Sequence, residues 1–94
     1  MSSRIQDGAG ISLDRQLSMI RFIIRNNKKG VTLGEVQMQM TVIHGLSDAW
    51  VAKYLKKWTR FGVVIPGGKG FRVDEEKMKL VWKARDEEAT RLEE

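Results

Sequence analysis

The chain has 94 residues and a formal net charge of +5, and 41% of its residues are hydrophobic. This length predicts one small domain with a thin core, which gains from dimerisation. The sequence contains no cysteine, which excludes a disulfide framework and thiolate metal sites and agrees with a cytoplasmic location. Apolar runs of membrane-spanning length and a hydrophobic N-terminal signal region are both absent, so we expect no membrane association.

Charge is unevenly distributed along the chain. Residues 1–73 contain 12 Lys and Arg against 4 Asp and Glu, whereas residues 74–94 contain 5 against 8. The first part therefore has a net charge of +8 and the second a net charge of −3. A basic region attracts a polyanion, and we expect the acidic terminal segment to point away from it.

The first predicted element is a helix that follows a short arm. Residues 1–11 contain two glycines and no hydrophobic periodicity, so we expect a flexible arm. Ser12 is a candidate N-cap for a helix that continues to about Asn27. Met19 and Phe22 lie beside its apolar stripe, where they either face a second subunit or cover the edge of their own core. The stripe itself consists of Leu13, Leu17, Ile20, Ile23 and Ile24.

A second helix begins at a strong start signal. Thr32 and Glu35 have the spacing of a capping box, with Thr32 as the N-cap. The helix should end around Ile43 and bury the face formed by Leu33, Val36, Met40 and Ile43. The short connection 44–46 then leads to another helix, and this spacing is typical of a helix-turn-helix. His44 is a lone histidine in a turn, which does not predict a base or a metal ligand.

The third helix has two well-separated faces. Ser47 is its candidate N-cap, and Gly62 fits the left-handed position after its last turn. The predicted buried arc contains Trp50, Val51, Tyr54, Leu55, Trp58 and Phe61. The opposite arc contains Ala49, Ala52, Lys53, Lys56, Lys57 and Arg60. One interpretation of this arc is a surface that contacts a polyanion, and the other is a surface that is simply exposed to solvent. The combination of small residues and cations on one face favours the first interpretation. The same helical spacing assigns the tryptophans to the core and not to base stacking.

A β-hairpin and a last helix complete the chain. Residues 63–65 and 71–73 are short β-type runs on either side of the turn 66–70, which carries Lys69. Asp74 then caps a terminal helix that has a coiled-coil-like apolar seam, widened by Val81. We expect this seam to pack on a second subunit. It consists of Met78, Trp82, Arg85, Ala89 and Leu92.

This order of elements resembles the winged helix-turn-helix class over about residues 12–92. The most specific parts are residues 30–36, which open the second helix, and residues 54–58 within the third. The C-terminal helix is similar to the dimerisation helix of PadR-like and MarR-like regulators. The small size, basic core and acidic tail resemble the site-binding protein of archaeal plasmid partition cassettes. That resemblance implies a palindromic site, spreading along DNA in segregation, and contact with an adaptor protein that recruits a motor ATPase. The turn 66–70 is shorter than the wing loop of many such regulators.

The predicted fold is therefore mainly α with a small two-stranded β-wing. It divides into an arm (1–11), a DNA-binding domain (12–73) and a dimerisation helix (74–94). We expect a homodimer that binds double-stranded DNA at an inverted repeat, in transcription regulation or plasmid partition. The alternative is a winged-helix protein-interaction module of a transcription or scaffold complex. With one histidine, no cysteine and no Walker spacing, we expect no enzymatic activity, cofactor or metal.

Two sets of residues are predicted to carry these functions. The predicted DNA-binding residues are Thr32, Ser47, Ala49, Ala52, Lys53, Lys56, Lys57, Arg60, Lys69 and Arg72. The predicted dimer-interface residues are Met19, Phe22, Met78, Val81, Trp82, Arg85, Ala89 and Leu92.

Overall fold

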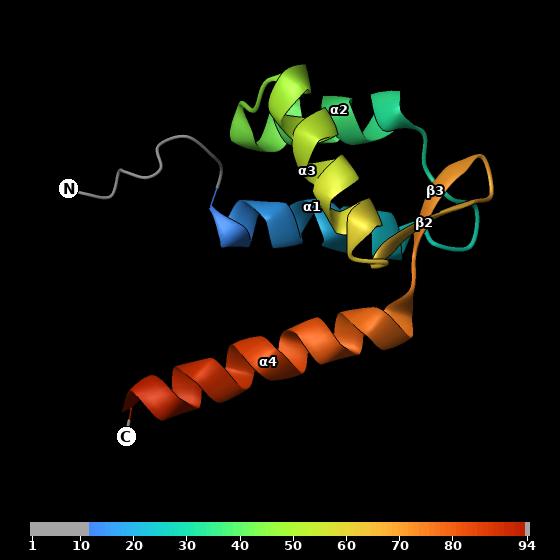
Figure 1. Cartoon of the computed structure of the whole chain (residues 1–94). Coiled ribbons are helices and arrows are strands. Elements are labelled where there is room, and N and C mark those ends of the chain that lie inside the picture. Colours follow the sequence, from blue (N-terminus) through green and yellow to red (C-terminus); the bar gives the residue numbers. More distant parts are fainter. Residues whose placement is uncertain (1–11, 94) are drawn as a thin grey trace.

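The computed structural model describes residues 12–93, apart from the side chains of Ala89 and of residues 91–93. The described residues form helices α1 (Leu13–Arg25), α2 (Leu33–His44), α3 (Asp48–Arg60) and α4 (Glu75–Glu93) and an antiparallel hairpin of β2 (Val64–Gly67) and β3 (Gly70–Val73). Helix α1 lies below α2 and α3, the hairpin closes one end, and α4 extends on the far side of α1 (Figure 1). This layout is compatible with a winged helix. None of the helices within residues 12–93 is long and apolar enough to cross a membrane.

The predicted helix starts are confirmed by their capping hydrogen bonds. The Ser12 and Ser47 hydroxyls accept from the third residue after each, at 3.3 Å in both cases. Thr32 and Glu35 form the full capping box, because the Thr32 hydroxyl accepts from the Glu35 N–H and the Glu35 carboxylate accepts from the Thr32 N–H. Helix α1 ends earlier than predicted, with Asn26 as its C-cap. Gly62 has the predicted left-handed conformation, with φ of 80°.

The hairpin makes one pairing that the sequence pattern did not predict. Val31, in the segment between α1 and α2, pairs with Phe71 through backbone hydrogen bonds of 2.9 and 2.7 Å. Gly70 is required at this crossing, because a Cβ atom there would lie 2.3 Å from the Val31 carbonyl oxygen. The hairpin is thereby fastened to the start of α2 instead of projecting freely.

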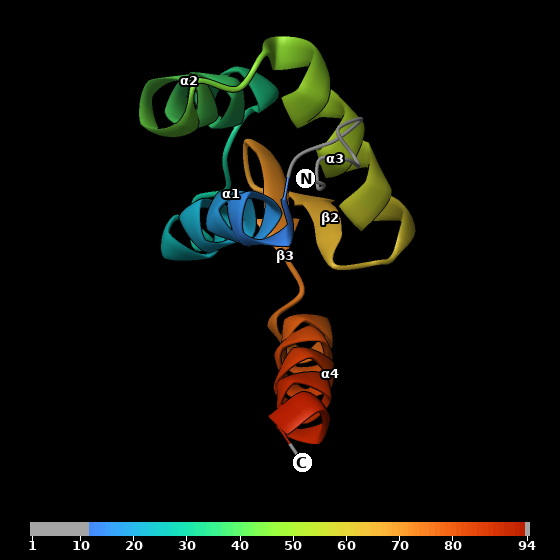
Figure 2. The same cartoon turned by 90° about the vertical axis from the view of Figure 1, so that its left-hand side faces the viewer.

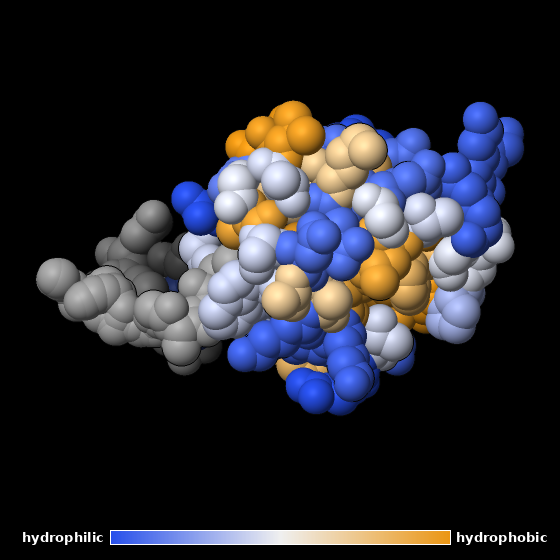
Figure 3. Space-filling view, turned by 90° about the horizontal axis from the view of Figure 1, so that it is seen from above, coloured by the Kyte–Doolittle hydropathy of each residue, from blue (hydrophilic) through white to orange (hydrophobic). Residues whose placement is uncertain are grey.

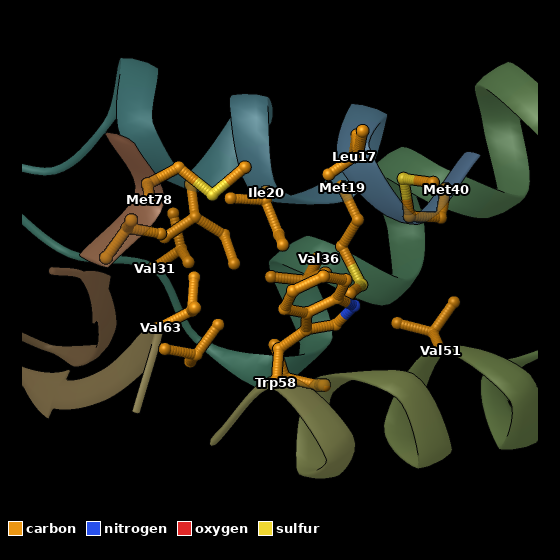
Figure 4. Close-up of a cluster of buried hydrophobic side chains, with 14 of the residues drawn as sticks. Leu17, Met19, Ile20, Val31, Val36, Met40, Val51, Trp58, Val63 and Met78 are labelled. Carbon is orange, nitrogen blue, oxygen red and sulfur yellow. The ribbon is translucent and has the colours of Figure 1, made fainter. Parts of the chain in front are cut away.

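The core lies between α1, α2, α3 and the hairpin (Figure 4). The predicted α1 residues Leu17, Ile20 and Ile23 are fully buried. Three predicted core residues of α1 and α2 are instead exposed, Leu13 at 45%, Leu33 at 38% and Ile43 at 57%. All three lie in the end turns of their helices, beyond the packed centre of the domain. The buried residues from α2 and from the turn that follows it are Val36, Met40 and Leu46.

Two predicted dimer-interface residues are corrected by their burial. Met19 and Met78 are 0% and 1% exposed within a single chain, so their side chains already belong to its own core. Helix α4 reaches the domain because Met78 inserts into that core, and Val81 and Trp82 pack half-buried against it. The upper half of the predicted seam therefore contacts the same chain. The predicted arm, residues 1–11, and the side chains of Ala89 and Leu92 lie outside the described residues.

Two polar contacts hold α4 against α1. The Arg21 guanidinium lies over the Trp82 ring, 4.9 Å from its centroid. The Arg85 guanidinium lies 3.1 Å from the Asp14 carboxylate in an exposed ion pair. Both contacts come from predicted interface residues of α4.

Candidate nucleic-acid interface

Helix α3 turns one face to solvent along its whole length. Ala49, Lys53, Lys56 and Arg60 are all exposed and follow one another at helical spacing, and we call this face the outward arc. The opposite face buries Val51, Leu55 and Trp58 in the core. The predicted separation of a cationic face from a core face is thus confirmed for these residues.

The cations of the outward arc have no carboxylate partners in the described part of the chain. Among the described side chains, neither Lys56 nor Arg60 forms an ion pair. The Lys53 ammonium lies 4.7 Å from the centroid of the Trp50 ring, an interaction that leaves its positive charge uncompensated. The acidic residue of α3 is Asp48, in its first turn. The arc therefore presents positive charge from Lys53 to Arg60, over about two turns of helix.

Lys57 does not belong to the outward arc. Its ammonium lies 3.3 Å from the Gln16 side-chain oxygen on α1 and 5.3 Å from the centroid of the Tyr54 ring. Its side chain is half-buried, whereas those of the arc cations are exposed. The structure thus places Lys57 on the flank of α3 that faces α1, beside the outward arc.

The buried arc of α3 is narrower than predicted. Trp50 and Tyr54 are half-buried and stack on each other with ring centroids 5.8 Å apart, and Phe61 is 54% exposed. The predicted six-residue arc is wider than the surface that the neighbouring elements can cover. Only its central stripe is fully buried, and the aromatic edge borders solvent.

The two hairpin cations are tied back to the domain. The Lys69 ammonium forms a 2.8 Å ion pair with Glu35 at the start of α2. The hydrogen bond from Lys69, followed by that from the Thr32 N–H, holds the pKa of the Glu35 carboxyl below its usual value. The Arg72 guanidinium donates a 2.7 Å hydrogen bond to the Asn27 carbonyl oxygen. Each of the two hairpin cations therefore has an internal partner.

Two predicted ligands use their hydroxyls for helix caps. The Thr32 and Ser47 side chains accept backbone hydrogen bonds at the starts of α2 and α3. Their positions are therefore fixed by folding, whether or not DNA is bound.

An apolar hollow lies beside the outward arc. It has a volume of about 250 Å³, and its walls come from the start of α2, the middle of α3 and strand β3. Viewed from above, hydrophobic surface lies among hydrophilic side chains on the side of the hairpin (Figure 3). The predicted ligand Ala52 is half-buried in the wall of this hollow, not on the arc. The lining residues are Leu33, Ala52, Leu55, Lys56, Thr59 and Phe71.

Two cations near the hairpin were not among the predicted ligands. Lys28 and Lys29 are exposed in the turn after α1, and the Lys29 carbonyl accepts a 3.1 Å hydrogen bond from the Lys69 N–H. This turn therefore adjoins the hairpin turn. The basic doublet is visible in the sequence, where its position indicates only the end of a helix.

Comparisons with family models, with curated proteins and with solved structures find no match for this chain.

Proposed function

We propose that this chain is a winged helix-turn-helix protein that binds double-stranded DNA as a homodimer at an inverted repeat. The observation that supports this most directly is the outward arc, with Lys53, Lys56 and Arg60 exposed on a helix whose other face is packed. A rigid helix with an uncompensated positive face fits the major groove in shape and in charge.

The two halves of the arc have different proposed roles. The N-terminal half of a recognition helix usually approaches base edges, so Ala49 and Lys53 would read sequence. Lys56 and Arg60 lie further along the helix and would bind phosphates, which positions the protein without specifying sequence.

The proposed second subunit would use α4 and the cleft beside it. An apolar cleft of about 600 Å³ separates α4 from the end of α3 and the start of α1. Its walls include Leu13, Phe61, Val81 and Ala84, and the first two are unusually exposed for their size. Filling this cleft with a second copy would cover apolar surface that a monomer leaves in water.

The position of α4 supports a second proposed role. Helix α4 lies on the opposite side of α1 from α3 (Figure 2), and residues 74–94 have a net charge of −3. An acidic helix remote from the outward arc would not repel DNA and would be accessible to a protein partner. Within the proposal, this partner is the adaptor of a partition complex, and the alternative biological role is transcription regulation.

The first experiment is a mobility shift with duplex DNA at two salt concentrations. A dimer that binds roughly 6–10 phosphates should lose about a thousandfold or more in affinity between roughly 50 and 200 mM salt. Sequencing the fragments that the protein retains from a random duplex library should then yield an inverted repeat. Affinity that does not change with salt would contradict DNA binding as the main function.

One observation favours the alternative, a protein-interaction module. Met38 and Val42 are both exposed on α2, on a helix face that the domain does not cover. Such a patch is typical of a protein contact. Binding to a protein partner with no salt-dependent DNA shift would support this function instead.

A further inference from the structure

The hollow beside the outward arc has walls that offer an occupant almost no hydrogen bonds. Leu33, Leu55 and Phe71 line it with apolar groups, and Ala52 contributes only a methyl group. The Thr59 hydroxyl already donates a 2.8 Å hydrogen bond to the Leu55 carbonyl. An occupant should therefore be apolar where it enters the hollow.

The mouth of the hollow is cationic. Lys56 both lines the hollow and belongs to the outward arc, and it forms no ion pair among the described side chains. Thr32 directly precedes Leu33, and Lys69 lies in the hairpin turn just before the strand that carries Phe71. Both lie in the same part of the surface, because Glu35 binds both of them. The hollow thus lies within the proposed DNA-binding surface, and its occupant should be an apolar group close to an anion.

We propose that this hollow receives the 5-methyl group of a thymine in duplex DNA. Thymine is the base that presents a methyl group in the major groove, and side chains such as Ala contact that methyl. The phosphates of the same strand would lie within reach of Lys56. This inference rests on the proposed function and adds to it a preferred base and the residues that select it.

The walls of the hollow also explain why it would select thymine over the other pyrimidine, cytosine. Ala52 allows the base edge to approach α3, while Leu33 is 38% exposed and would be shielded from water when the methyl enters. A cytosine at the same position has only a hydrogen at C5, so it would leave the hollow unfilled and its apolar walls exposed to water.

The test uses one duplex made in two forms. A duplex retained by the protein from a random library is synthesised with thymine and, separately, with uracil at every thymine position, which removes the methyl groups only. The wild-type protein should bind the uracil duplex about fourfold more weakly for each methyl that enters a hollow, or about sixteenfold for a dimer with two half-sites.

A matched pair of variants assigns this effect to the hollow. Leu33→Ser changes an exposed wall residue and should bind the two duplexes equally. Met38→Ser changes an exposed apolar residue of the same helix outside the hollow, and should keep the wild-type ratio. Thermal melting of both variants checks that they are folded.

Three results would overturn the inference. Equal wild-type affinity for the two duplexes, with salt-dependent binding intact, rejects the thymine contact and leaves the proposed function standing. If Leu33→Ser weakens both duplexes by the same factor, so that the wild-type ratio persists, the hollow contacts the sugar-phosphate backbone instead. If the protein retains no duplex from the library at any salt concentration, the proposed function fails as well.

Discussion

The side chain of Asn27 pairs with the backbone of Val73 as a neighbouring strand would. Its amide oxygen accepts a 2.7 Å hydrogen bond from the Val73 N–H, and its amide nitrogen donates a 3.0 Å hydrogen bond to the Val73 carbonyl. The same nitrogen lies 3.1 Å from the Glu75 carboxylate. Asn27, in the turn after α1, therefore joins the last residue of the hairpin to the first turn of α4.

Replacing Asn27 should destabilise the domain. Asn27→Ala leaves the partly buried backbone groups of Val73 unpaired, and we expect a loss of about 1–3 kcal/mol in the free energy of unfolding. Asn26→Ala is the matched control, because its side chain makes one exposed hydrogen bond to the Phe22 carbonyl. Urea denaturation of both variants measures the difference. Equal stabilities would show that the link between Asn27 and Val73 contributes little.

Substitutions at the buried residues Gln16 and Trp58 should have strongly non-additive effects on the free energy of unfolding. The indole N–H donates a 3.1 Å hydrogen bond to the Gln16 side-chain oxygen inside the core. Gln16→Leu leaves that N–H buried without this partner and should cost about 1–3 kcal/mol. Adding Trp58→Phe removes the unpaired donor, so the double variant should be more stable than the sum of the single costs predicts. Strictly additive costs from urea titrations would contradict a direct interaction.

Trp58→Ala tests the larger role of this residue in the core. We expect a cost of about 3–5 kcal/mol, enough to unfold a marginal small domain. A variant that melts like the wild-type protein but no longer binds DNA would place Trp58 among the residues that bind the ligand instead.

Cations on the two sides of α3 should behave differently in DNA binding. Lys56→Ala and Arg60→Ala should each reduce the slope of log affinity against log salt by about 0.9 for every phosphate that the variant no longer binds. Lys53→Ala should relax sequence preference, at about 1–3 kcal/mol for a good base contact. Lys57→Ala is the internal control, and should lower stability while leaving the salt slope unchanged. A reduced slope for Lys57→Ala would return this residue to the DNA-binding surface.

Glu35→Gln should increase affinity for DNA. Gln preserves the geometry of the capping box but removes the carboxylate that holds Lys69, so Lys69 becomes available to a phosphate. The expected readout is tighter binding with a steeper salt dependence in a mobility shift. Unchanged affinity would show that the hairpin lysine stays remote from DNA.

Glu35 should also make the stability of the domain depend on pH. The pKa of Glu35 is lowered in the folded state by Lys69 and the Thr32 N–H. Its stabilising effect is therefore present above the ordinary pKa of a glutamate in the unfolded chain and is lost as the pH falls through the lower folded-state pKa. Melting curves from neutral pH to about pH 3 should show a component of this loss that is absent in Glu35→Gln. Identical pH profiles for the two proteins would contradict the assignment.

The proposed dimer is tested by two variants of α4, each of which introduces one negative charge. Ala84 lines the apolar cleft, whereas Leu80 is exposed on the same helix and does not line it. Ala84→Glu should yield a monomer by light scattering at micromolar concentration, with weaker binding to an inverted repeat. Leu80→Glu should remain dimeric. A wild-type protein that is monomeric and still binds the repeat tightly would leave the dimer without support.

Local signals in the sequence predicted the elements of this fold well. The caps at Ser12, Thr32 and Ser47 and the glycine at 62 act through groups within a few residues, so their effect is the same in any domain that contains them. The alternation of faces on α3 is also local, and it correctly separated Leu55 and Trp58 from the outward arc.

Only the tertiary structure decided how much of each apolar face is covered. Helical periodicity assigns a side chain to a direction, but the neighbouring element and its width come from contacts between distant residues. Met19 and Met78 were predicted to face a second subunit and are buried in their own chain, while Phe61 was predicted to be buried and is exposed.

The candidate site shows the same division. The cations of the outward arc follow from their spacing on one helix. Lys57 points to Gln16, which is 41 residues away in sequence, and Lys69 points to Glu35, which is 34 residues away. The hollow needs α2, α3 and β3 together, so no single stretch of sequence contains it. These neighbours are brought together by packing between residues that are distant in the sequence. The contacts with these neighbours determine which cations and which apolar groups remain available to DNA.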